Sequence, residues 1–347
     1  MTEPTASAGT GDSPRPVLSV SPVVLPAPGR AVDLQLRVSA PLTGTGLPVI
    51  LLSHGQGPSN NLSSLNGYAP LADQWAAQGF VVIQPTHLSS RSLHLDPGLP
   101  GAPLHWRSRA EDMTHVLDRL DAIEDAVPLL RGRMDRTKVA VAGHSMGGHT
   151  ASLLLGARLT DPHDGTVVNL AEPRVKAGVL LAAPGRGGDS LSTFAAENYS
   201  FFLTTDFSTM RTPALVVAGD KDSSAHLTVR GPEWHTDPYV LSPGRKSLLT
   251  LFDAEHGLGG ISGYDVAETT DENPGRVTAV ARLTAAYLRS ELSPGDSAWQ
   301  SAVDTLAAAS DPVGRIESKE PRGSAGQWPR GGRPRERGRE HGVDATG

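Results

Sequence analysis

Cysteine is absent from this 347-residue chain. Its absence excludes disulfides, thiolate metal ligands and a cysteine nucleophile, but it does not fix the compartment. Long apolar runs are also missing, since none approaches the roughly 18 residues that a membrane-spanning helix needs. The formal net charge of −6 is small for this length and gives no reason to expect nucleic acid or an anionic membrane as a main partner.

The two ends of the chain are poor in apolar residues. Residues 1–16 have neither the basic nor the apolar part of a secretory signal, and their Pro, Gly, Ser and Thr content predicts a disordered segment. Residues 313–347 form an Arg/Gly/Pro-rich tail. The arginines of residues 330–339 could bind nucleic acid through its backbone charge, but the interspersed glutamates favour a solvated, disordered tail. We therefore expect a soluble, cytoplasmic protein with a single domain over residues 17–312.

Short apolar runs alternate with helical stretches between these ends. Such alternation predicts an α/β fold with a mostly parallel sheet. Residues 17–26 and 31–40 alternate apolar and polar side chains, as antiparallel edge strands do. Apolar runs, typical of strands buried on both faces, cover residues 48–52, 80–83, 139–142, 177–183 and 213–218, and residues 246–252 are expected to form the last strand. Helices are expected near residues 68–78, 113–123, 151–158, 274–292 and 296–309.

Two long segments without a clear period, residues 88–104 and 184–212, interrupt this pattern. Loops of this length inside a domain are uncommon and often functional, so we expect the first to border the site. The second contains Phe194, Tyr199, Phe201, Phe202 and Phe207. These aromatics fit either a satellite core or a partial lid that walls an acyl pocket.

The pattern Gly143-His144-Ser145-Met146-Gly147 stands where an apolar run turns into a helical one. A serine hydroxyl is a weak nucleophile that needs a base and an exposed position. A sharp strand-to-helix turn provides the exposure, and glycines two residues before and after the serine avoid collisions in the bend. The pattern therefore indicates a nucleophile elbow with Ser145 as the nucleophile, against the alternative of a Gly-rich structural turn.

The base and the acid are expected after later strands, because the carboxyl ends of parallel strands share one edge of the sheet. His256 follows the last buried strand in a glycine-flanked loop, and His87 is its rival. His144 and His149 are better explained as neighbours that pack around the elbow. Asp222 is preferred as the acid over Asp220. Asp253 and Glu255 are less favoured, because each would have to fold back on its own loop.

The oxyanion of an acyl-transfer intermediate needs backbone amides already in place. Met146, directly after the nucleophile, is expected to supply one. The second is expected from the loop that follows residues 48–52, at Gln56, with Gly57 as the alternative. No metal or other cofactor is expected.

Together, these motifs resemble the α/β-hydrolases. The segments 49–55, 80–87, 143–148 and 254–257 resemble the branch of chlorophyllase-like, dienelactone-hydrolase-like and platelet-activating-factor-acetylhydrolase-like esterases, and more distantly the bacterial polyester hydrolases. The resemblance covers roughly residues 34–292 and implies a mostly parallel eight-stranded sheet flanked by helices. It places the triad on Ser145, Asp222 and His256 and the oxyanion amides on Met146 and Gln56. The cysteine nucleophile of the dienelactone hydrolases is absent.

Three hypotheses for function follow. The first is a serine esterase that cleaves a small-molecule carboxylic ester through an acyl-enzyme. The second keeps the fold and makes the protein an acyltransferase or a thioesterase. The third, which the full set of required residues disfavours, is a non-catalytic binding protein. Oligomeric state and the identity of the ester do not follow from the sequence.

Overall fold

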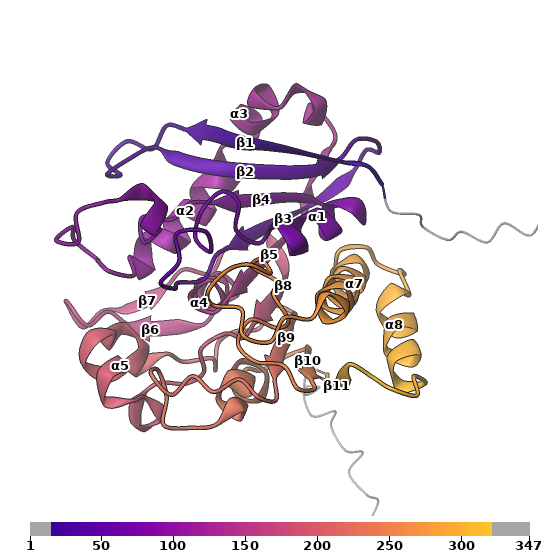
Figure 1. Cartoon of the computed structure of the whole chain (residues 1–347). Coiled ribbons are helices and arrows are strands. Elements are labelled where there is room, and N and C mark those ends of the chain that lie inside the picture. The colour runs from indigo at the N-terminus through magenta and orange to yellow at the C-terminus, as the bar shows by residue number, and fades with distance from the viewer. Residues whose placement is uncertain (1–14, 321–347) are drawn as a thin grey trace, which may run out of the picture.

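Nine strands form one sheet, in the order β1-β2-β4-β3-β5-β8-β9-β10-β11, in a computed structural model that describes residues 15–320 (Figure 1). The run from β4 to β10 is parallel, and only the edges are antiparallel. The strands of the sheet are β1 (Val17–Leu25), β2 (Leu34–Pro41), β3 (Leu47–Ser53), β4 (Val81–Pro85), β5 (Met134–His144), β8 (Val175–Leu181), β9 (Ala214–Gly219), β10 (Lys246–Leu251) and β11 (Gly314–Lys319). The predicted α/β fold is confirmed, with nine strands in place of eight.

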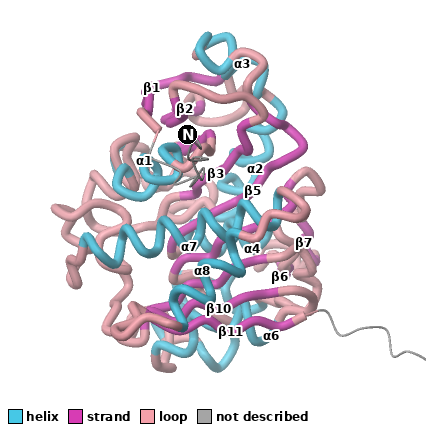
Figure 2. Tube along the Cα trace, turned by 90° about the vertical axis from the view of Figure 1, so that its right-hand side faces the viewer, coloured by secondary structure: helices cyan, strands magenta, loops and turns pink. Residues whose placement is uncertain are grey.

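Helices cover both faces of the sheet. Those on one face are α1 (Ala69–Ala77), α7 (Pro274–Leu292) and α8 (Ala298–Ala307), and those on the other are α2 (Trp106–Asp118), α3 (Leu120–Ala126) and α4 (Met146–Leu154). Figure 2 shows α7 and α8 lying in front of the strands. Along β3, Val49 and Leu51 join one apolar cluster while Ile50 and Leu52 join the other. This double burial explains why the strand is a continuous apolar run.

Four segments differ from the sequence-based expectation. The helix expected around residues 113–123 breaks at Arg119, where the backbone leaves the helical region. A small hairpin of β6 (Arg158–Thr160) and β7 (Val167–Asn169) pairs outside the main sheet. The long segment 184–212 contains the short helix α5 (Thr193–Asn198), and α6 (Asp237–Leu241) follows β9.

The prediction of a disordered tail over residues 313–347 is wrong for its first residues. Gly314–Lys319 form β11, which pairs antiparallel with β10 along its whole length. An uncovered β10 would leave a row of backbone donors and acceptors at the sheet edge, and β11 satisfies them. The single domain therefore extends past residue 312. Residues 1–14 and 321–347, with most of the predicted N-terminal segment and tail, lie outside the described residues.

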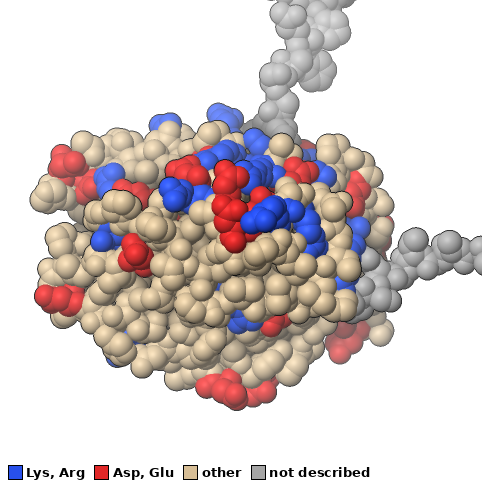
Figure 3. All heavy atoms as spheres, turned by 90° about the horizontal axis from the view of Figure 1, so that it is seen from above, with Lys and Arg blue, Asp and Glu red and all other residues tan. Residues whose placement is uncertain are grey.

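The face seen from above in Figure 3 carries basic and acidic side chains close together. Helix α3, which lies on that side in Figure 1, contributes to such pairs through Asp121 with Arg136 and Asp125 with Arg131. Neither sign of charge therefore dominates this face. Within residues 15–320, no helix is both long and apolar enough to cross a membrane.

The strand order brings distant loops together. The chain leaves β3 toward β4 and then returns to the other side of β3 as β5, which makes a switch point of the kind that binds ligands in open α/β sheets. Ser53 pairs with Gly143 at the carboxyl ends of β3 and β5, and Gly219 pairs with Leu251 at those of β9 and β10. The four loops expected to carry the catalytic residues, those after β3, β5, β9 and β10, therefore all start at the carboxyl ends of the parallel strands.

Candidate active site

Ser145 occupies the turn between β5 and α4. Its backbone has φ 53° and ψ −119°, a conformation that costs a non-glycine residue about 1–3 kcal/mol and persists only where the surroundings enforce it. A Cβ on Gly143 would lie 2.0 Å from the Gly147 carbonyl oxygen, and one on Gly147 would lie 2.0 Å from the Ser53 carbonyl oxygen. The turn therefore requires glycine at both positions, which explains the spacing of the motif.

Ser145 lines a cavity of about 300 Å³, together with Met146 and Gln56. The three residues predicted to supply the nucleophile and the oxyanion amides thus share one space. Both long loops contribute to its apolar wall, through Leu104 from the first and Pro184, Tyr199 and Phe202 from the second. Phe201 and Phe202 also belong to a satellite apolar cluster, so the aromatic segment is both a small core and a pocket wall.

Asp222 and His256, which follow β9 and β10, are in contact. Nδ1 of His256 donates to Oδ2 of Asp222 at 2.9 Å, with Asp222 fully buried and the His256 side chain 32% exposed. Burial alone would raise the pKa of the Asp222 carboxyl, but hydrogen bonds from His235 and His256 outweigh it and hold that pKa well below its usual range. An ionised Asp222 favours the Nδ1–H tautomer of His256 and leaves Nε2 as the basic atom.

The loop that carries His256 is attached to the elbow through His144, the residue before Ser145. His144 Nε2 donates to the backbone carbonyl of His256 at 2.8 Å, and the two rings lie 5.0 Å apart. Among the described residues, no hydrogen bond joins the Ser145 hydroxyl to the His256 ring. Such contacts are often long without substrate and tighten when it binds. The pairing of Ser145 with His256 therefore stays a prediction.

A buried chain of hydrogen bonds links the elbow to the loop after β3. The Gly55 amide donates to Tyr68 Oη at 2.9 Å, and the Tyr68 hydroxyl donates to His144 Nδ1 at 2.7 Å. Burial lowers the pKa of His144 to about 3, so the ring is neutral and can accept at Nδ1 while donating at Nε2. The backbone next to Gln56 is thereby held against the elbow. The sequence identified Tyr68 only as the start of a helix and gave no sign of this role.

Arg109, on α2, ties the loops after β3 and β4 to helix α4. Its guanidinium is fully buried and donates to the His54 carbonyl, to Ser89 Oγ at 2.6 Å and to Thr150 Oγ1 at 3.2 Å. Burial lowers its pKa to about 9, which leaves it charged at neutral pH. Because the planar guanidinium binds all three groups at once, it fixes the loop after β3 relative to α4.

The rival base has other partners. His87 is fully buried, and its Nε2 and Nδ1 lie 2.9 Å from Ser53 Oγ and Asp112 Oδ2 respectively. Burial holds the pKa of His87 well below its ordinary value. His87 is thus part of a buried network, whereas His256 is the partly exposed histidine that contacts a buried carboxylate.

Among the described residues, the remaining candidates for the acid make no hydrogen bond to the His256 ring. Asp220 has no hydrogen bond to His256 among the described residues, and its Oδ1 has no partner there. Glu255 accepts from Thr270. His149, expected to pack near the elbow, is buried with its ring 5.4 Å from that of Phe201 and 5.0 Å from that of Phe202.

Asp222, His235 and His256 bring one carboxylate oxygen and two ring nitrogens within 4.8 Å of one another. Zinc is bound by atoms of these types. Here the same atoms already bond to each other, with His256 and His235 both facing Oδ2 of Asp222. We assign the cluster to a hydrogen-bond network around Asp222. His235 was not singled out from the sequence, because it stands 13 residues after Asp222 in a segment without a motif.

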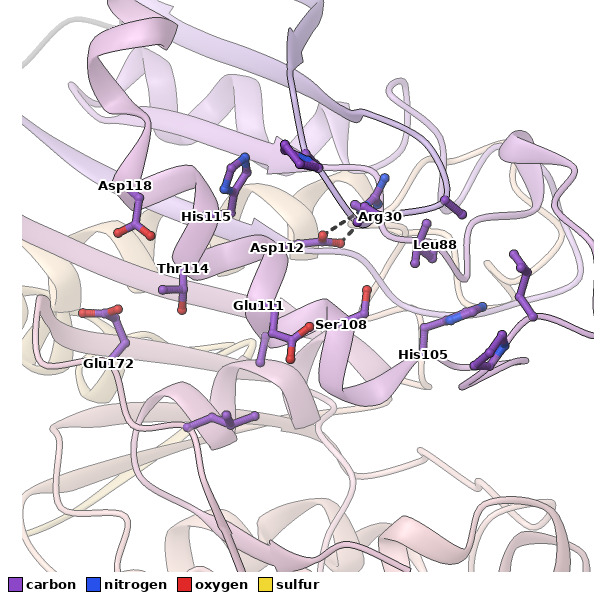
Figure 4. Close-up of a pocket in the computed structure, with 18 of the residues that line it drawn as sticks. Arg30, Leu88, His105, Ser108, Glu111, Asp112, Thr114, His115, Asp118 and Glu172 are labelled. Atoms are coloured by element: carbon purple, nitrogen blue, oxygen red, sulfur yellow. Dashed lines mark hydrogen bonds and ion pairs between the residues drawn. The ribbon is translucent and has the colours of Figure 1, made fainter. Parts of the chain in front are cut away.

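A larger hollow of about 1110 Å³ lies along α2 and is shown in Figure 4. Several charged groups that line it are already satisfied. Arg30 bonds Asp112, and Asp118 and Glu172 both pair with Arg174. Ser145 does not line this hollow. The larger cavity is therefore not the one that contains the predicted nucleophile. We place the site at the smaller cavity, because Ser145 lines it.

No protein-family model matches the chain, but curated relatives do. It is 26% identical over 155 residues to a platelet-activating factor acetylhydrolase from Cavia porcellus, covering 35% of this chain and 34% of the relative. It is 29% identical over 150 residues to cutinase 2 of Thermobifida cellulosilytica, covering 43% and 44%, and to cutinase cut1 of Thermobifida fusca, covering 43% and 36%.

The similarity confirms, at modest identity, the predicted resemblance to serine esterases of the α/β-hydrolase type. The chain spans less than half the length of each of these relatives. Its own activity and substrate are therefore matters for proposal.

Proposed function

We propose that the protein is a serine hydrolase that cleaves a carboxylic ester through an acyl-enzyme. Ser145 Oγ attacks the ester carbonyl while His256 Nε2 takes its proton, and the imidazolium then protonates the departing alcohol. Water, activated by His256, attacks the acyl-enzyme and releases the acid. Asp222 orients His256 and stabilises its charged form.

One observation carries this proposal. Ser145 is held in a strained turn on a cavity that Met146 and Gln56 also line, and the His256–Asp222 pair is attached to the same turn through His144. In this proposal the amides of Met146 and Gln56 donate to the oxyanion. Met146 begins α4, whose N-terminal dipole also favours negative charge there.

The cavity favours a small acyl group. Its volume of about 300 Å³ lies at the lower end of ligand pockets, and aromatic side chains close its apolar wall. One relative is named as an acetylhydrolase, in agreement with a short acyl chain. We therefore propose esters of short acids as the preferred substrates. The expected cytoplasmic location stays a prediction.

The test is a panel of p-nitrophenyl esters from acetate to palmitate. We expect kcat/KM to be highest for the short acyl chains and to fall as the chain outgrows the cavity. Ser145→Ala is expected to lower kcat by at least about 10³-fold. Ser152→Ala is the matched control, because its buried hydroxyl lies on α4, directly after the elbow, and has the Gly148 carbonyl as its only hydrogen-bond partner among the described residues. Its activity should match that of the unchanged protein.

Three results would contradict the proposal. Equal activity of Ser145→Ala and Ser152→Ala would exclude Ser145 as the nucleophile. Ester consumption that yields a transferred acyl group rather than free acid, when an alcohol is supplied, would favour the acyltransferase alternative. Cleavage of thioesters without cleavage of oxygen esters would favour the thioesterase.

A further inference from the structure

His235 is a second histidine on the Asp222 carboxylate. It lies in the short 3₁₀ turn Pro232–Thr236 and is fully buried. Its Nε2 is 3.2 Å from Asp222 Oδ2, the same oxygen that accepts from His256 Nδ1 at 2.9 Å. Nothing in the proposed mechanism requires a second imidazole at this place.

The donors and acceptors around this ring constrain which of its nitrogens carry a proton. His235 Nδ1 lies 2.9 Å from the Ala183 carbonyl oxygen, which can only accept, so Nδ1 carries a proton. Nε2 faces Asp222 Oδ2 and, at 3.1 Å, Ser224 Oγ. Ser224 has one proton and lies 3.1 Å from Asp222 Oδ1, the other oxygen of the carboxylate. With Nε2 unprotonated, a lone pair would face the buried carboxylate.

With Nε2 protonated, every contact becomes a donor–acceptor pair. His235 then donates to the Ala183 carbonyl from one side of the ring and to Asp222 from the other, and Ser224 donates to Oδ1. The carboxylate receives bonds from His235, Ser224 and His256, and each comes from a different loop or turn. A buried ion pair is tolerated where such bonds satisfy both charges.

We propose, on the basis of the proposed esterase function, that His235 is a positioning residue that binds Asp222 as an imidazolium and fixes it for His256. Ala183, which follows β8, anchors the other side of the ring. The His235 charge also offsets part of the Asp222 charge that His256 experiences. Its removal would therefore leave a stronger field to stabilise the protonated His256.

The groups that face His235 come from several elements. Asp222 and Ser224 belong to the loop after β9, and the His256 ring lies 5.5 Å away in the loop after β10. His144 on β5 and His226 are the other histidines close enough to interact, and both have a pKa lowered by burial first and by neighbouring histidines second. Asp237, two residues on from His235, is paired with Arg230 at 2.7 Å.

Two variants with amide side chains at residue 235 separate the effect of holding Asp222 in place from the effect of the positive charge. The side-chain nitrogen of His235→Asn can take the place of Nδ1 and keep the bond to Ala183, but it cannot reach Asp222. The nitrogen of His235→Gln can take the place of Nε2 and keep a neutral donor to Asp222. The measurements are kcat, KM and the pH dependence of kcat/KM for p-nitrophenyl butyrate, whose acidic limb reports the base of the free enzyme.

We expect His235→Asn to lower kcat by about 10- to 100-fold, as small displacements of catalytic groups do. His235→Gln should retain kcat within about threefold. Both variants lose the charge, so the acidic limb should move to higher pH by about half a unit or more in each. KM should change little, because His235 does not line the cavity with Ser145. The proposal would be overturned if the acidic limb of the pH profile of kcat/KM were unchanged in both variants, or if both variants lost the same amount of kcat.

A measurement without turnover separates this proposal from the esterase function. In protein labelled with ¹⁵N-histidine, we expect one ring with both nitrogens protonated at pH 7, and its signals should be absent from His235→Asn. A neutral His235 ring would overturn the proposal even if the enzyme is active. The expected signals in a protein without esterase activity would instead reject the proposed function and keep the protonation of His235.

Discussion

At the residue scale, the parts of the site that follow from steric rules could be predicted. Gly143 and Gly147 are required because a Cβ at either place would collide with backbone, and that requirement is visible as a spacing in the sequence. The preference for Asp222 over Asp220 could be argued only from the length of a loop. His235 and Tyr68 could not be found, because their roles depend on contacts between segments far apart in the chain.

Arg109 provides a test at this scale. Arg109→Lys keeps the charge but cannot reach His54, Ser89 and Thr150 together, so buried acceptors lose their donor. We expect a loss of about 2–4 kcal/mol in the free energy of unfolding and a lower kcat, because the loop of Gln56 is released. Urea unfolding and ester kinetics measure the two effects.

The matched control is Arg107→Lys, two residues away on the same helix. Arg107 is 42% exposed and pairs with Asp161, so its replacement should change the unfolding free energy by no more than about 0.5 kcal/mol. Equal losses in the two variants would show that Arg109 does not hold the loops.

At the element scale, the apolar runs predicted the central strands well because burial on both faces leaves a clear pattern. β11 was missed because it is an edge strand with polar residues on one face and the single large apolar side chain Ile316 on the other. Its stability comes from pairing with β10, which local composition does not reveal. The break at Arg119 is equally invisible in the periodicity that runs through it.

The edge strand can be tested with Ile316→Asp. Ile316 packs against the apolar cluster beneath α7 and α8, so a carboxylate there should cost about 1–3 kcal/mol of unfolding free energy. Glu317→Asp is the control, since Glu317 is exposed on the opposite face of β11. If Gly314–Lys319 were a disordered tail, urea unfolding would not distinguish the two variants.

At the scale of the whole molecule, buried histidines link stability to pH. Burial, the largest cause in each case, lowers the pKa of His54, His87, His144 and His149. The unfolded chain therefore binds more protons than the folded one below pH ~6.5, so stability is lost as pH falls. Asp112 acts in the opposite direction, because burial raises its pKa to about 6. Among the described residues, six histidines have a lowered pKa, and two carboxyls, Asp112 and Glu291, have one raised by burial. This balance predicts a net loss of stability in acid.

His149 isolates one part of this dependence. Neither of its ring nitrogens has a partner among the described residues, and its pKa is lowered to about 3. His149→Leu should therefore keep or raise stability at pH 7 and reduce the slope of the unfolding free energy by about 1.4 kcal/mol per pH unit below pH 6. Urea unfolding at several pH values measures the slope. The exposed His163→Leu is the control, and a slope shared by both variants would contradict the prediction.

The most direct test of the central claim is covalent labelling of the nucleophile. On incubation with a fluorophosphonate, the intact mass should increase by one adduct, peptide mapping should place that adduct on Ser145, and Ser145→Ala should remain unlabelled. An unchanged mass under conditions that label a control serine esterase, or an adduct on another serine, would contradict the account.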